Sequence, residues 1–257
     1  MAKNDFSAES AENYEQKCLC VLVLDISGSM REIVDKSNMT YTGETVYMDG
    51  KEYDLVTGGV SKLDLLNQGL ADFYNEIVND ETTSQRLELC IITFNDNVEV
   101  LQEPALLDNV TIPTLRGEGE TAMADAINVA IDKVDARKRW YKETGQTYYR
   151  PWIILMTDGV PNADQDMDSL AFRIKVDTEA KKYAFLPVGV EGADMEVLQK
   201  IAGKGMKAVK LKGMRFAQFF KWLSASMGTV TKAEEGQTVN LSEGATGEDG
   251  WMDSFVI

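Results

Sequence analysis

Residues 19–24 form an uninterrupted apolar run that stops abruptly at Asp25. A continuous apolar run of this length is typical of a strand buried on both faces, as in a parallel sheet covered by helices. The run is followed by Ser27 and Ser29, so one carboxylate and two hydroxyls lie within five residues. These oxygen donors, without imidazole or thiolate among them, suit a hard cation such as Mg²⁺.

The rest of the chain alternates similar apolar runs with amphipathic stretches. Leu63, Leu66 and Leu70 are three or four residues apart, which predicts a helix over about 61–78. We expect further helices near 121–134, 169–182, 195–201 and 216–227, and strands near 87–94, 98–101, 152–157, 185–190 and 209–211. Pro187 weakens one of these strands because proline cannot donate to a ladder. The pattern predicts an α/β, Rossmann-like fold with a mostly parallel central sheet and helices on both faces.

Two later segments add oxygen donors at corresponding places in the pattern. Thr121 opens a predicted helix, and Asp158 ends the predicted strand that begins at Trp152. In open α/β sheets, ligands bind outside the carboxyl ends of the strands, so we expect Asp25, Thr121 and Asp158 to meet there. Taken singly, each segment also fits an ordinary helix cap or turn.

Together and in this order, these segments resemble the metal-ion-dependent adhesion site of von Willebrand factor A (VWA) domains. The stretch from about residue 17 to 227 is similar to bacterial VWA proteins of the TerY/YegL type, associated with tellurium-resistance-like gene clusters. The resemblance implies that Ser27, Ser29 and Thr121 coordinate Mg²⁺ (or Mn²⁺) directly. It implies that Asp25 and Asp158 act mainly through bound waters and through hydrogen bonds to those hydroxyls.

The expected function is divalent-metal-dependent protein binding. Neutral direct ligands leave the ion short of a negative donor, which an acidic residue of a protein partner would supply. The family context implies a stress-response (tellurium-resistance-like) or phage-related complex. We therefore expect a binding protein rather than an enzyme. Two alternatives stay open: a metal-dependent hydrolase or phosphatase, with Glu118 or Glu120 as its base, and a scaffold with a vestigial site. Either glutamate could instead stand in for the partner's acid.

We expect three regions in the chain. Residues 1–16 form an N-terminal extension, residues 17–228 the VWA domain, and residues 229–257 an acidic C-terminal tail. Within the domain, residues 31–60 form an insertion in which Asp49-Gly50 predicts a β-hairpin. Because the insertion leaves the metal loop, we expect it beside the site, where its tyrosines shape the choice of partner. A merely decorative hairpin is the alternative.

Composition excludes several other classes of function. The chain of 257 residues has no histidine, which rules out Ser-His-Asp and Cys-His catalysis and histidine-ligated zinc. A net charge of −16 argues against binding to nucleic acid. No apolar run approaches the roughly 18 residues of a membrane span, and no signal-peptide pattern opens the chain, so we expect a cytoplasmic protein without membrane association. The three cysteines are expected as reduced, buried thiols.

One basic cluster needs its own interpretation. Lys133, Arg137, Lys138 and Arg139 are interleaved with acidic residues, and we expect them on a solvated helix face.

Overall fold

The computed structural model describes residues 14–48, 51–203 and 207–234, together with residues 237, 241, 245, 251 and 252. The strands are β1 (Cys18–Asp25), β2 (Ile33–Asp35), β3 (Thr40–Met48), β4 (Lys51–Thr57), β5 (Val60–Ser61), β6 (Leu87–Phe94), β7 (Val98–Leu106), β8 (Trp152–Thr157), β9 (Ala184–Gly189) and β10 (Val209–Lys210). The helices are α2 (Lys62–Val78), α3 (Glu81–Arg86), α4 (Met123–Thr144), α5 (Met167–Glu179), α6 (Met195–Ile201) and α7 (Phe216–Lys232), with 3₁₀ turns η1 (Gly28–Arg31) and η2 (Leu107–Asn109).

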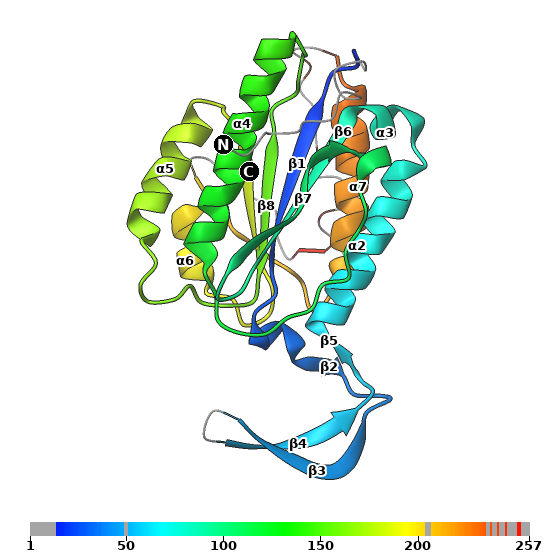
Figure 1. The fold of residues 1–257 in the computed structure, drawn as a ribbon, viewed down its shortest axis with the longest axis vertical. Helices are drawn as coiled ribbons and strands as arrows, with labels where there is room; N and C mark the ends of the chain where they lie inside the picture. The colour runs from blue at the N-terminus through cyan, green and yellow to red at the C-terminus, as the bar shows by residue number, and fades with distance from the viewer. Residues whose placement is uncertain are drawn as a thin grey trace, which may run out of the picture.

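A six-stranded sheet in the order β10-β9-β8-β1-β6-β7 forms the centre of the molecule (Figure 1). Strand β1 pairs in parallel with both β6 and β8, and β8, β9 and β10 continue the parallel arrangement. The edge strand β7 runs antiparallel to β6, as its short connection requires. The predicted fold class, with its mostly parallel sheet, is confirmed.

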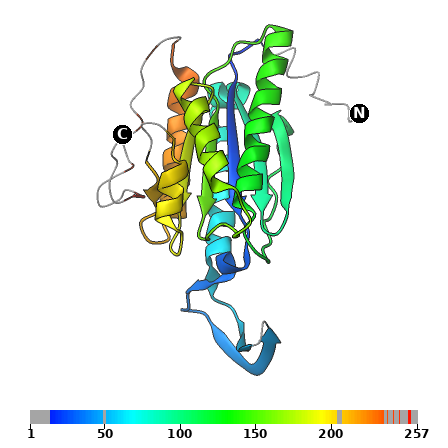
Figure 2. The same cartoon turned by 90° about the vertical axis from the view of Figure 1, so that its left-hand side faces the viewer.

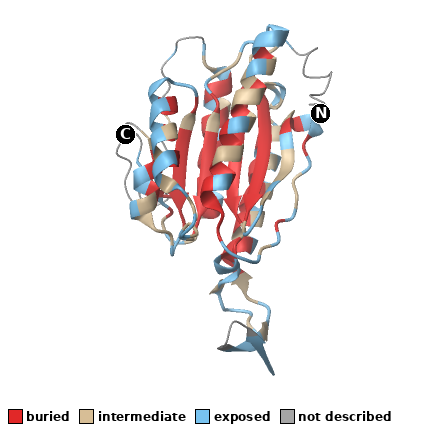
Figure 3. Ribbon diagram, turned by 60° about the vertical axis from the view of Figure 1, so that its left-hand side comes forward, coloured by how far each residue is buried: buried red, intermediate tan, exposed pale blue. Residues whose placement is uncertain are grey.

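Helices cover both faces of this sheet, with α2 and α7 on one side and α4, α5 and α6 on the other (Figures 1 and 2). Alternate residues of β1 pack against the helical layers on the two faces of the sheet. Leu22 packs in the core under α2 and α7, whereas Val21 and Val23 pack in the core under α4 and α5. Every residue of β1 is buried, which explains its continuous apolar run (Figure 3).

Local signals account for most element boundaries. Ser61 caps α2 through a capping box with Asp64, close to the start that the apolar periodicity predicts. Pro187 is accommodated within β9, because the neighbouring strand β10 pairs only with Val188 and Gly189. The short helix α3, with Asp80 as its N-cap, was not predicted because it lacks an apolar stripe.

The insertion forms a two-stranded ribbon that extends beyond the end of the sheet (Figures 1 and 2). Its strands β3 and β4 pair antiparallel, as predicted, and the Asp49-Gly50 turn lies outside the described residues. At its base, β2 and β5 form a second small antiparallel sheet. We call β3, β4 and their connection the arm. It leaves the body between η1 and α2, so it adjoins the loop that follows β1.

The prediction of a solvated basic face is wrong for Arg137. Its side chain is 1% exposed and binds the carboxylate of Glu88, with Nε 2.7 Å from Oε2 and an Nη atom 2.5 Å from Oε1. The hydroxyl of Tyr141 donates to the same carboxylate at 2.5 Å. The helical spacing from Arg137 to Tyr141 places both on the buried face of α4, where Glu88 supplies the opposite charge.

Part of the acidic tail packs against the domain. Trp251 is fully buried, with its ring centroid 4.8 Å from that of Phe219 and 5.0 Å from that of Trp222 on α7. The backbone N–H of Lys212 donates to the carbonyl of Trp251 at 2.8 Å. The predicted N-terminal extension falls almost entirely outside the described residues. Within the described part of the chain, no helix has the length and hydropathy needed to cross a membrane.

Candidate metal centre

The three motif segments lie together at the carboxyl end of the sheet. Asp25 is the last residue of β1, Asp158 directly follows β8, and Thr121 lies two residues before α4. From β1 the chain crosses to β6 on one side and later to β8 on the other, so the strand order reverses at β1. This is the position at which ligands bind in open α/β sheets.

The hydroxyls of the first loop point toward Asp158. Ser29 Oγ donates to Asp158 Oδ1 at 2.6 Å, and Ser27 Oγ lies 3.1 Å from Ser29 Oγ. The loop is held in place because Gly28 N donates to the carbonyl of Gly119 at 2.9 Å. Two hydroxyls and a carboxylate from segments 129 residues apart in the sequence therefore share one small region.

Asp25 is a fully buried carboxylate with a fixed orientation. Its Oδ1 accepts from Ser27 N at 2.8 Å, and its Oδ2 accepts from Thr157 Oγ1 at 2.5 Å. Burial, with a smaller contribution from the nearby charge of Asp158, raises the pKa of Asp25 from 3.8 to about 6, although these hydrogen bonds act in the opposite direction. An ionised carboxylate in this position is costly without a neighbouring cation.

Thr121 supplies the third hydroxyl of the candidate site. A side-chain carbon placed on Gly159 would lie 3.0 Å from Thr121 Oγ1 and 3.3 Å from Asp25 Oδ2, so both oxygens approach the same point. Gly159 leaves that space open. The backbone N–H of Thr121 donates to the amide oxygen of Asn162 at 3.0 Å, which fixes the start of the α4 segment.

The donor set fits Mg²⁺ or Mn²⁺. It consists of three hydroxyls and two carboxylates, all hard oxygen donors with a combined charge that balances a divalent ion. Among the described residues, no group of three or more His, Cys, Asp or Glu side chains is placed to hold a metal. A carboxylate-rich cage of the kind that holds calcium is thus not found there. The structure brings all five predicted residues together, and their role as metal ligands remains a prediction.

Two further charged residues adjoin the site and were missed by the sequence analysis. Lys62 Nζ lies 2.8 Å from Asp158 Oδ2 and 2.8 Å from Glu32 Oε2. Burial disfavours the charged form of Lys62 and lowers its pKa. The contacts with Asp158 and Glu32 outweigh this effect, so the pKa of the ammonium is raised. Lys62 is the first residue of α2, where the helix dipole disfavours a cation, and this anomaly is the signal that could have identified it.

Glu118 and Glu120 lie on the loop before Thr121, and both are exposed. The backbone of that loop is fixed by Asp96, whose Oδ1 accepts from Glu120 N at 3.0 Å. The acid that contacts Lys62 beside the site is Glu32, which directly follows η1.

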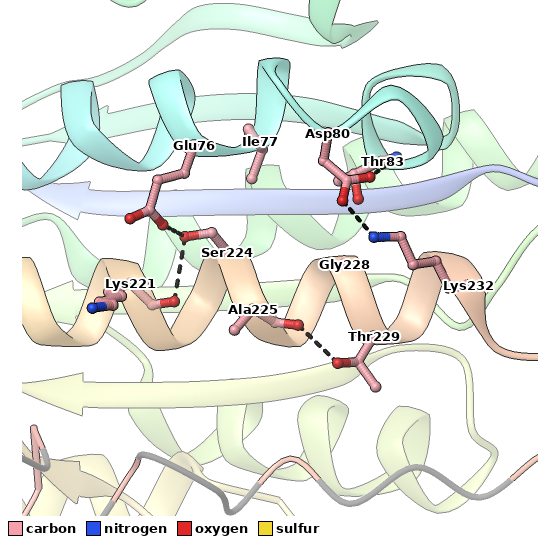
Figure 4. A pocket seen from close by; sticks show the side chains of 10 residues that line it. All are labelled: Glu76, Ile77, Asp80, Thr83, Lys221, Ser224, Ala225, Gly228, Thr229 and Lys232. Carbon is pink, nitrogen blue, oxygen red and sulfur yellow. Dashed lines mark hydrogen bonds and ion pairs between the residues drawn. The ribbon is translucent and has the colours of Figure 1, made fainter.

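A separate groove of about 390 Å³ lies between α7 and the end of α2 with α3 (Figure 4). Its polar groups bind one another, because Ser224 donates to Glu76 and Lys232 pairs with Asp80. The groove lies on the helical layer, at the opposite end of α2 from Lys62. It therefore has no connection with the rim at the carboxyl end of the sheet, where the candidate metal centre lies.

A family model described as von Willebrand factor type A domain matches residues 68–220, more than half of the chain. The chain belongs to this family. The matched region includes Thr121 and Asp158 but begins within α2, after the loop that carries Asp25, Ser27 and Ser29. Domains of this family typically bind proteins. No curated protein matches the sequence.

Solved structures with the same fold include bacterial pilus proteins. The PilB minor pilin from Streptococcus sanguinis is 15% identical with a TM-score of 0.55, covering 84% of this chain and 62% of the pilin chain. The pilus adhesin SpaC from Lactobacillus rhamnosus GG is 13% identical with a TM-score of 0.55, covering 86% and 32%. The vWF domain of the type V pili tip protein Mfa5 from Porphyromonas gingivalis is 9% identical with a TM-score of 0.53, covering 87% and 99%. At these identities the likeness concerns the fold alone.

Proposed function

We propose that this VWA domain binds one Mg²⁺ (or Mn²⁺) at the carboxyl end of its sheet and uses the ion to bind an acidic residue of a protein partner. The observation that carries the proposal is the contact between Ser29 Oγ and Asp158 Oδ1 at 2.6 Å, with Ser27 Oγ 3.1 Å from Ser29 Oγ. It places neutral oxygen donors beside a carboxylate at the point where strand order reverses.

The division between neutral and charged groups supports binding of an anion. Ser27, Ser29 and Thr121 would hold the ion through neutral hydroxyls, while Asp25 and Asp158 would balance its charge through hydrogen bonds and water. An ion held in this way remains short of a negative ligand. A carboxylate from the partner would take a coordination position otherwise held by water, which makes partner binding depend on the metal.

We propose a binding protein rather than an enzyme. A metal-dependent hydrolase would need a general base or nucleophile within hydrogen-bond reach of the reacting atoms. The chain has no histidine, and the two glutamates that were considered for this role, Glu118 and Glu120, are exposed. A phosphatase screen on the metal-loaded protein distinguishes the hydrolase from the binding module, and a lack of metal affinity would indicate a vestigial scaffold.

We further propose a cytoplasmic component of a TerY/YegL-like system, a stress-response (tellurium-resistance-like) or phage-related complex with other proteins. The sequence likeness of residues 17–227 supports the subfamily. Three buried cysteines without a disulfide between them are typical of a reducing compartment. The net charge of −16 disfavours nucleic acid and favours partners with basic surfaces around the acid that binds the metal.

In this proposal, the arm determines which partner binds. Tyr41, Tyr47 and Tyr53 on β3 and β4 are 63%, 73% and 46% exposed. Tyrosine offers rigid, amphipathic contact area and is enriched at binding hot spots. The arm leaves the body between η1 and α2, next to the metal loop, so a partner bound to the ion would also meet the arm.

The test combines a metal titration with partner capture. Calorimetry with Mn²⁺ should give one site in the wild type and a loss of affinity of at least about tenfold in Asp25→Asn. Asp72→Asn removes an exposed carboxylate of α2 and serves as the control. Affinity purification from the native host, with and without chelator, should recover partners that depend on the metal. Equal Mn²⁺ binding by Asp25→Asn and the wild type would refute the site.

A further inference from the structure

Lys62 is a cation enclosed within the rim of the site. The residue is 3% exposed, and its ammonium meets three acceptors. They are Asp158 Oδ2 at 2.8 Å, Glu32 Oε2 at 2.8 Å and the backbone carbonyl of Glu191 at 3.0 Å. An ammonium has three N–H donors, so all of them have a partner here. The acceptors come from three separate segments, which fixes the position of the charge.

Lys62 also completes the hydrogen bonding of Asp158. One carboxylate oxygen accepts from Ser29 at 2.6 Å, and the other accepts from Lys62 at 2.8 Å. The carboxylate is therefore held in one orientation, and its negative charge is balanced by a neighbouring positive charge. A metal ion beside Ser29 would share Asp158 with the ammonium.

We propose that Lys62 is a built-in cation that keeps the metal affinity of this site low until a partner carboxylate arrives. The inference rests on the proposed metal site. Asp25 and Asp158 balance the charge of a divalent ion, and Lys62 then adds a positive charge. Glu32, whose side chain is 67% exposed, offsets that charge only in part, which leaves positive charge in excess. Repulsion between like charges a few ångströms apart is several times stronger inside a protein than in water. A partner carboxylate removes this excess, so metal and partner bind together more tightly than either does alone.

The same lysine connects the site to the arm. Glu32 precedes β2 and Lys62 follows β5, so their ion pair closes the base of the insertion. The backbone repeats this contact, because Lys62 N donates to the carbonyl of Glu32 at 3.1 Å. Lys62 thus contacts both the metal-site carboxylate and the base of the arm. The metal site and the base of the arm therefore share one lysine.

The test is the affinity of the full chain for Mn²⁺ alone, measured by calorimetry. Lys62→Gln removes the charge but keeps an amide that can donate to Asp158, and we expect the affinity to increase at least about tenfold. Lys142→Gln makes the same change in net charge at the far end of α4, about 28 Å along the helix from Met123. This control should stay within about twofold of the wild type. Unchanged or weaker binding by Lys62→Gln would overturn the inference.

A second variant keeps the test decisive if Lys62→Gln fails to fold. The side chain of Glu32 is 67% exposed, so Glu32→Gln should leave the fold intact while exposing the full charge of Lys62 to the ion. We expect Mn²⁺ binding at least about twofold weaker, and unchanged or tighter binding would contradict the proposal.

Failure of the metal site itself gives a different pattern. If neither the wild type nor any variant binds Mn²⁺, the proposed function fails, and this inference fails with it. If the wild type binds and Lys62→Gln binds no better, only the role of Lys62 is refuted. Binding that appears only in Lys62→Gln would support Lys62 as the group that keeps the ion out.

Discussion

Ser29 and Asp158 are 129 residues apart in the sequence, yet the hydroxyl of one donates to the carboxylate of the other at 2.6 Å. The bond joins the loop after β1 to the loop after β8, the two central parallel strands. Neither residue lies within a strand. The contact exists because parallel strands bring their carboxyl ends to the same edge, and it provides the most direct test of the site.

Replacing Ser29 with alanine should weaken Mn²⁺ binding at least about tenfold and leave the fold intact. Ser29 is exposed, so its replacement leaves no buried cavity. The hydrogen bond that the variant loses is the one to the charged Asp158, and such a bond contributes about 1.5–3 kcal/mol to the free energy of unfolding. Calorimetry gives the affinity, and thermal melts in chelator give the stability. Ser84→Ala, at a half-buried serine on α3, is the control. Wild-type affinity in Ser29→Ala would remove this hydroxyl from the ligand set.

The stability of the metal-free protein should depend on pH through Asp25. Its pKa is raised from 3.8 to about 6 in the folded state, so the folded state binds more protons than the unfolded state between these values. The stabilising contribution of the protonated form is fully present below about pH 4 and is lost as pH rises through 6. The change is at most about 3 kcal/mol, since one pKa unit corresponds to about 1.4 kcal/mol.

Urea unfolding without metal at several values between pH 4 and 7 measures this effect, with Asp25→Asn as the comparison. The free energy of unfolding of the wild type should fall relative to that of the variant as pH rises. Saturating Mg²⁺ at pH 7 should restore the free energy of unfolding that the wild type loses relative to Asp25→Asn, because the ion balances the negative charge of the carboxylate. Parallel curves for the two proteins would show that Asp25 does not carry the predicted buried charge.

Removing the arm should separate partner choice from metal binding. Thr40 and Thr57 are paired neighbours at the start of β3 and the end of β4, so a short Gly-Ser linker can replace residues 40–57. The ligand oxygens lie elsewhere, and a change of loop length costs little closure entropy. We expect Mn²⁺ affinity within about threefold of the wild type and a loss of chelator-sensitive partners. Recovery of the same partners by the deletion variant would mean that the arm does not select them.

Arg137 should be essential for stability and irrelevant to the site. Replacing it with methionine leaves the buried carboxylate of Glu88 without its ion pair, which costs about 3–5 kcal/mol. Urea unfolding measures the loss. The double replacement Glu88→Gln with Arg137→Met removes both charges and should recover much of it. A loss below about 1 kcal/mol in Arg137→Met would show that Glu88 finds another partner or becomes protonated.

The sequence alone determined the α/β architecture and the residues that end its strands. Burial on both faces requires a continuous apolar run, as in β1, and burial on one helix face requires apolar residues every three or four positions, as in α2. Both patterns, and the turn chemistry of the arm, are local properties. The sequence also named Ser27, Ser29, Thr121 and the two aspartates, because each stands at a strand end or a helix start.

Only the tertiary structure decided which charges meet. Lys62 is 96 residues from Asp158, and Arg137 is 49 residues from Glu88. From the sequence alone, such side chains are expected to be exposed to solvent. A charge is buried only where another segment supplies its counter-charge, and the sequence does not show which segments meet. Trp251 likewise packs on α7 against Phe219 and Trp222, which precede it by 32 and 29 residues. These pairings depend on the order of strands in the sheet, and that order brings a lysine into a site whose sequence motif contains only oxygen donors.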